Sequence, residues 1–182
     1  MRNRERLIIL VLVLLLTISV GYATLMTTIT INGTTTVRAN SWNVYIESVA
    51  NVLANGSASV TTNPSVVSGD TTTTSLTYDV ALNQPGDSYE FEFTVKNAGS
   101  MDIILSKLPT LSGLGVDQDA YINHTLTNDD DSAVTVENSV ITAGGSKTYK
   151  VRVEYDADIE SSELPSTNQS LNLSAELEYV QR

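Results

Sequence analysis

Strict alternation of apolar and polar residues is the feature of this sequence that most restricts its fold. Apolar side chains occupy every second position in residues 89–95, 149–155 and 171–179. A period of two residues is that of a β-strand with one buried face and one solvated face. Turn-forming residues such as Gly144 and Gly145 lie between these segments. The pattern therefore predicts an all-β fold.

Further strands are indicated by weaker signals in the rest of the chain. They are expected in residues 28–37, 42–49, 57–62, 101–107, 121–127 and 133–141, whereas residues 76–82 alternate as plainly as the three segments above. Residues 108–116 contain Pro109, Gly113 and Gly115 and predict a loop. Short strands at this spacing favour a single immunoglobulin-like or jelly-roll β-sandwich of about eight to ten strands.

The N-terminus carries a different pattern, because residues 7–20 are apolar apart from Thr17 and Ser19 and follow three arginines. A basic start, an apolar stretch and small residues before the cut are the features of a secretory signal. Gly21 and Ala23 supply the small residues and predict cleavage before Thr24. An uncleaved anchor is the alternative, because about 20 apolar residues suffice for a helix to span a bilayer.

Both alternatives give the same division of the chain. Residues 1–23 form an N-terminal hydrophobic helix that serves as signal peptide or membrane anchor, and residues 24–182 form the β-sandwich domain. The domain is expected to be secreted or to lie at the extracellular face of the cell membrane, with the N-terminal segment as its only contact with the membrane.

The composition of the exported part limits its partners and its chemistry. The chain has 10 basic and 21 acidic residues, and the first 23 residues hold three arginines and one glutamate, which leaves 7 and 20, a net charge of −13. Nucleic acid is excluded as a partner, because binding phosphates needs clustered Lys and Arg. With no cysteine in the chain, packing and backbone pairing must stabilise the domain without disulfides.

No motif for catalysis is found. His124 is the only histidine, and neither a second histidine for a metalloprotease nor the neighbours of a hydrolase triad accompany it. We interpret His124 as an ordinary strand residue and expect no catalytic residue and no cofactor.

The acidic turns at residues 117–119, 129–131 and 156–158 offer oxygen ligands for calcium, but their spacing does not match the twelve-residue calcium loop, so solvated turns are favoured.

Several features together resemble a known family of surface proteins. They are the leader ending at Ala23, the Thr-rich residues 27–34 and a strand around Trp42; residues 84–91 followed by 95–100 look like the middle of exported immunoglobulin-like or jelly-roll sandwiches. In this order, in a cysteine-free chain of this length, they are similar to the TasA and camelysin family of biofilm matrix fibre proteins of Gram-positive bacteria. The resemblance implies a fibre subunit whose freed N-terminal segment adds as a strand to the next subunit.

The candidate donor strand lies directly after the expected cleavage site. Leu25, Thr27, Ile29 and Ile31 form one row of side chains that alternates with a more polar row. The alternative is that this segment is the first strand of its own domain. We therefore expect a non-enzymatic structural protein of the cell surface or matrix, self-associating or binding other surface proteins. A secreted or membrane-tethered adhesin or ligand-binding module is the alternative.

Overall fold

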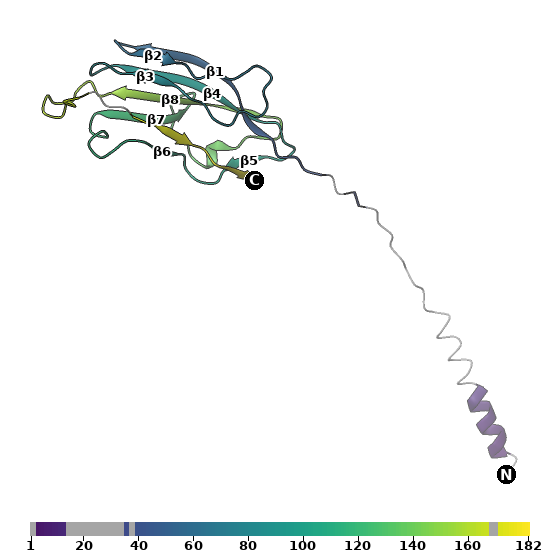
Figure 1. The fold of residues 1–182 in the computed structure, drawn as a ribbon. Coiled ribbons are helices and arrows are strands. Elements are labelled where there is room, and N and C mark those ends of the chain that lie inside the picture. Colours follow the sequence, from purple (N-terminus) through teal and green to yellow (C-terminus); the bar gives the residue numbers. More distant parts are fainter. Residues whose placement is uncertain (1–2, 14–34, 37–38, 168–170) are drawn as a thin grey trace. The chain divides into compact units, whose positions relative to one another are not determined.

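A computed structural model describes residues 3–13, 35–36, 39–167 and 171–182 of the chain. The chain divides into two units, residues 1–38 and residues 39–182, and each is described by itself. In the first unit, residues 3–13 form a helix with exposed side chains, drawn in purple in Figure 1. Within the described residues, no helix combines the length and the apolar character that crossing a bilayer requires.

The second unit is built almost entirely of β-strands (Figure 1). Its described elements are β1 (Val44–Asn55), β2 (Ser59–Thr62), β3 (Asp79–Ala81), β4 (Ser88–Asn97), β5 (Ile103–Leu105), β6 (Thr110–Ser112), β7 (Ile122–Asn128), the short 3-10 helix η1 (Glu137–Ser139), β8 (Ser146–Tyr155), β9 (Ser174–Glu176) and β10 (Tyr179–Gln181). The predicted all-β character is therefore confirmed.

The strands form one larger sheet and three small ones. The larger sheet has four strands in the order β1-β4-β8-β7, and the others are the pairs β2-β3, β5-β10 and β6-β9. Neighbouring strands are antiparallel in every pair. The long strands β4 and β8 lie at the centre of the larger sheet, so both have partners on each side.

The two central strands show why the alternation predicted their burial correctly. In β4 the side chains of Tyr89, Phe91 and Phe93 are buried, and in β8 those of Tyr149 and Val151 are buried. The register pairs Phe91 with Val151 and Phe93 with Tyr149, so both strands turn their apolar rows to the same face. Phe93 and Tyr149 lie 5.7 Å apart between ring centroids, a distance at which aromatic rings attract each other.

The main core lies against this face and also draws on the small sheets. Ile103 and Leu105 of β5 are buried against the β4 and β8 side chains, and Val60, Val80 and Tyr179 of β2, β3 and β10 pack around them. A second, smaller core lies at the end of the sheet where β7 begins; its buried members are Tyr121, Ile122, Val153 and Tyr155.

Three expectations about individual segments are wrong. Residues 133–141 form no strand; they contain η1 and two isolated bridges, Thr127 to Ala133 and Ile103 to Ile141. Residues 108–116 are not all loop, because β6 lies within them. The continuous alternation of residues 171–179 is divided between β9 and β10, which pair with β6 and β5 respectively. Alternation reports which face is buried, and partner strands elsewhere in the sequence decide where pairing starts and stops.

Candidate functional site

An apolar cleft lies over the core-facing side of the four-stranded sheet. It has a volume of about 490 Å³, and Phe91, Phe93 and Val95 of β4 and Val151 of β8 form its floor. Trp42, with 52% of its surface exposed, lines the end of the cleft nearest the start of β1. The floor side chains belong to the main core, so the cleft lies directly over that core.

Two segments line the sides of the cleft. We call residues 74–78 the first wall and residues 173–177 the second wall. The first wall leads into β3, which has β2 as its only partner among the described strands, and the second wall contains β9, which has only β6. In the described part of the chain, no backbone hydrogen bond joins the two walls. Each wall therefore has a backbone edge that lacks a strand partner.

The walls run in opposite directions along the sheet. Thr73, just before the first wall, accepts a hydrogen bond from Ile46 near the start of β1 at 2.7 Å, whereas Leu82 packs on the smaller core at the other end. Leu171, before the second wall, also packs on the smaller core, and Tyr179 after it packs on the main core. A strand placed between the walls would be parallel to one and antiparallel to the other.

Polar side chains also line the cleft, and burial shifts the pKa of several of them. Burial lowers the pKa of His124, which projects from the core-facing side of β7. Burial, followed by the influence of Tyr89, raises the pKa of Tyr78 to about 12. The Tyr78 hydroxyl is buried without a hydrogen-bond partner among the described residues. Tyr179 differs, because its hydroxyl lies 2.7 Å from that of Tyr149 and the two are hydrogen bonded.

A buried carboxylate fixes the loop that leads into β4. Asp87 has no exposed surface, and its carboxylate accepts hydrogen bonds from the backbone N–H of Ser57 at 2.7 Å, Asn83 at 2.7 Å and Gln84 at 3.1 Å, and from the Ser57 hydroxyl at 2.8 Å. Gly56 adopts a φ of +72°, and a Cβ there would overlap the Asp87 Oδ1. The carboxylate thus ties the turn after β1 to the start of β4.

A buried amide does the same at the other end of β4. Asn97 is 1% exposed, and its Nδ2 donates to the carbonyls of Met101 at 2.8 Å, Ile141 at 3.1 Å and Thr142 at 3.2 Å. Its Oδ1 accepts a hydrogen bond from the N–H of Gly99 at 3.0 Å. Strand β4, which supplies most of the cleft floor, is therefore fastened at both ends.

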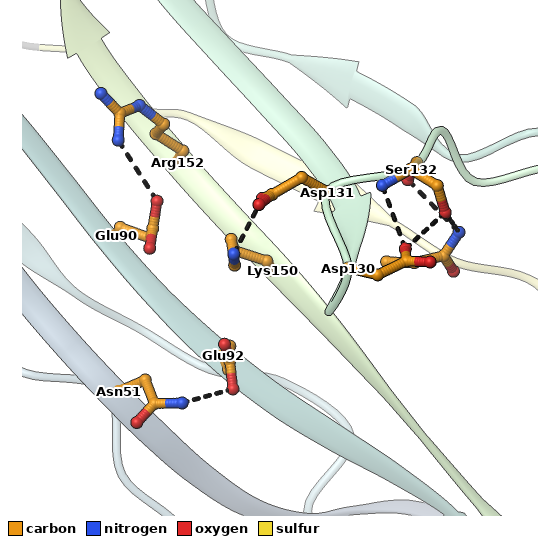
Figure 2. A network of polar contacts seen from close by, with 9 residues as sticks. Asn51, Glu90, Glu92, Asp130, Asp131, Ser132, Lys150 and Arg152 are labelled. Carbon is orange, nitrogen blue, oxygen red and sulfur yellow. Dashed lines mark hydrogen bonds and ion pairs between the residues drawn. The ribbon is translucent and has the colours of Figure 1, made fainter.

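The opposite face of the four-stranded sheet carries charged and polar residues (Figure 2). Arg152 lies between Glu90 and Glu154, with nitrogen to oxygen distances of 3.3 and 3.1 Å. Lys150 pairs with Asp131 at 2.8 Å. Acidic and basic side chains on this face pair with one another, so we interpret it as a solvated surface.

Most residues proposed as sites from the sequence lie outside the described residues. They are the cleavage residues Gly21, Ala23 and Thr24 and the candidate donor-strand residues Leu25, Thr27, Ile29 and Ile31. His124 is described, and it belongs to β7 as expected. Its position in the cleft was not expected.

The carboxylates of the acidic turns form hydrogen bonds and an ion pair with other residues of the chain. Asp130 accepts hydrogen bonds from the N–H and hydroxyl of Ser132, Asp131 pairs with Lys150, and Asp156 accepts from the N–H of Asp158. Within the described ranges, no three His, Asp or Glu side chains come together in a way that would hold a metal ion.

Sequence reasoning missed the cleft itself, and one signal for it was present. Burial alternates without interruption from Leu171 to Tyr179 and from Leu76 to Leu82, although only part of each segment pairs as a strand. The alternation therefore indicated two extended segments that pack on a core. It gave no information on whether those segments meet.

No protein-family model, curated protein or solved structure matches this chain. What the cleft does must therefore be inferred from its own geometry.

Proposed function

We propose that this chain is an exported, non-enzymatic structural protein of the cell surface or matrix, and that its cleft accepts an extended strand from another copy. Residues 1–23 act as the secretory signal or anchor. In this proposal the remainder forms an immunoglobulin-like or jelly-roll β-sandwich with the four-stranded sheet as one layer. Support for two layers comes from the main core, to which the four-stranded sheet and four of the strands outside it contribute.

The observation that carries the proposal is the gap between two unpaired backbone edges above an apolar floor. An extended strand would fit both the edges and the floor. Its N–H and C=O groups would pair with the backbone edges, and every second side chain would pack on the apolar floor. The candidate donor residues Leu25, Thr27, Ile29 and Ile31 form such a row. The resemblance to the TasA and camelysin family points to the same mode of assembly.

Deletion of residues 24–32 tests the proposal directly. We expect the exported chain to form filaments and the deletion variant to remain a folded monomer, because it lacks the strand but keeps the cleft. Electron microscopy and sedimentation would show the filaments, and circular dichroism would show the fold. Filaments formed by the deletion variant would contradict the proposal.

A single cysteine offers a reversible test of the cleft. The chain has no cysteine, so Ala175→Cys, in the second wall, can be modified selectively with an aromatic disulfide reagent. The added ring would fill the space that the strand needs, and assembly should stop and then resume after reduction. Ala81→Cys in β3, where the residue is exposed and does not line the cleft, is the matched control and should assemble in both states.

The size of the cleft also supports the alternative of a ligand-binding module. A volume of about 490 Å³ lies within the range of about 300–1,000 Å³ that small-molecule sites occupy. A binding module would stay monomeric with or without residues 24–32. The deletion therefore separates the two functions.

A further inference from the structure

His124 is the side chain lining the cleft whose charge changes nearest to neutral pH. It lies on β7 opposite Val153 of β8, in the row that also contains Ile122 and Leu126, and this row faces the core. The imidazole is half-buried, and no hydrogen bond or ion pair involves it within the described residues. Part of its surface borders the cleft.

No charged side chain forms an ion pair with the His124 imidazole in the described part of the chain. The titratable groups on the core-facing or cleft-lining sides of the surrounding elements are Tyr45 of β1, Tyr121 before β7, Tyr149 and Tyr155 of β8, Glu176 and Tyr179 in or after the second wall, and Tyr78 of the first wall. Glu176, the carboxylate among them, is exposed to solvent. Strand β6 contributes none. Arg152 and Glu154 of β8 lie on the opposite face, where they pair with each other. Burial alone lowers the pKa of His124.

Filling the cleft would bury the imidazole further. A buried polar group without a hydrogen-bond partner costs about 1–3 kcal/mol, and a buried charge costs more. An inserted strand must therefore bring a polar side chain to His124, and it must meet the imidazole in its neutral form. A row of purely apolar side chains would pack on the apolar floor but would leave the imidazole without a hydrogen-bond partner.

Building on the proposed function, we infer that His124 selects the inserted strand: the neutral imidazole forms a hydrogen bond with a hydroxyl side chain of the strand, and the protonated imidazole excludes the strand. The candidate donor row contains one hydroxyl, that of Thr27, among Leu25, Ile29 and Ile31. Thr27 of a second copy is therefore the partner. The neighbouring Thr28 belongs to the other row and takes no part.

The inference predicts a specific pattern of coupling between two positions. The measured quantity is the critical concentration for filament formation by the full exported chain at pH 7.5. His124→Leu and Thr27→Val each leave one polar group buried without a partner, and each should raise the critical concentration about fivefold to tenfold. The double variant restores an apolar match and should return to within about twofold of the unmodified chain. Thr28→Val is the matched control and should show no coupling to His124→Leu.

The inference also predicts the direction of the pH dependence. Insertion buries the imidazole further, so the assembled state binds fewer protons and assembly is favoured at higher pH. Below the His124 pKa, the critical concentration should rise by up to about tenfold per pH unit. His124→Gln keeps a hydrogen-bonding side chain without a titrating group, and it should assemble at pH 7.5 and lose this dependence between pH 7.5 and 5.5. Acidic side chains titrate mainly near pH 4 and change little in this range.

The outcomes separate this inference from the proposed function. If the unmodified chain does not assemble, or if residues 24–32 can be deleted without effect, both fail. If assembly needs those residues but the two single substitutions act additively, or His124→Gln keeps the full pH dependence, the inference alone is overturned. Circular dichroism of each variant as a monomer confirms that a loss of assembly does not come from unfolding.

Discussion

Replacement of Asp87 by asparagine should destabilise the chain strongly, although it changes one atom of the side chain. The Oδ2 atom accepts hydrogen bonds from the Ser57 hydroxyl and from the N–H groups of Asn83 and Gln84, while Oδ1 accepts from the N–H of Ser57. An amide has only one oxygen. If that oxygen takes the place of Oδ2, the new NH₂ group faces the Ser57 N–H, and two donors meet with no acceptor.

The magnitude follows from the groups left without partners. One buried donor that loses its acceptor costs about 1–3 kcal/mol, and the bonds that remain lose the strength that a charged acceptor gives them. We expect Asp87→Asn to lower the free energy of unfolding by about 2–4 kcal/mol at pH 7. For a chain of this size, each kcal/mol lowers Tm by about 2–4 °C.

The pH dependence of this loss is a second part of the prediction. Burial raises the pKa of the Asp87 carboxyl, but the hydrogen bonds from Ser57, Asn83 and Gln84 outweigh it, and the net pKa is below its ordinary value. A carboxyl with a lowered pKa stabilises the fold above its unfolded pKa of about 3.9, and this stabilisation is lost as the pH falls through the folded pKa. The difference between the unmodified chain and Asp87→Asn should therefore shrink below about pH 4.

Urea unfolding followed by circular dichroism at pH 7 and at pH 3 measures both effects. Asp79→Asn in β3 is the matched control, because Asp79 is exposed and its carboxylate makes no hydrogen bond or ion pair with the described residues. That variant should stay within about 0.5 kcal/mol of the unmodified chain. An Asp87→Asn variant as stable as the control at pH 7 would refute the reasoning.

Two further substitutions test the interior of the same unit, and their expected effects have opposite signs. Asn97→Ala leaves the carbonyl of Met101 and the N–H of Gly99 without a partner among the described residues, whereas the carbonyls of Ile141 and Thr142 keep their bonds from the N–H groups of Ile103 and Gly145. It should lower the free energy of unfolding by about 2–4 kcal/mol; a loss below about 1 kcal/mol in urea unfolding would contradict this. Tyr78→Phe removes a buried hydroxyl that has no partner among the described residues and should raise Tm by a few degrees, on the order of 1 kcal/mol, in a thermal melt.

The sequence was most informative where one strand has partners on both sides. In β4 and β8 every apolar residue of the alternating row from Tyr89 to Val95 and from Tyr149 to Tyr155 is buried. The reason is physical: a strand with a polar row and an apolar row has only one arrangement that keeps the apolar row out of water. The face that forms the core, and hence the floor of the cleft, was predictable to the residue.

The cleft was not predictable from the sequence, because it lies between two segments, residues 74–78 and 173–177, that do not pair with each other. Residues 76–82 and 171–179 show the same alternation as β4, yet only Asp79–Ala81 in the first segment pairs as a strand. Whether two such segments become neighbours in a sheet depends on their positions over the floor, which distant parts of the chain set through Asp87 and Asn97. Local pattern carries no information about this.

The same gap links the stability of this unit to assembly. With no cysteine in the chain, this unit depends on packing and backbone pairing, and β3 and β9 each have one edge without a strand partner among the described strands. Any strand that fills the gap adds burial and pairing to the folded state only, so it stabilises that state by mass action. If a second copy supplies the strand, a filament is more stable than its free subunits, and apparent stability must rise with protein concentration. A ligand-binding module without self-assembly would show no such rise.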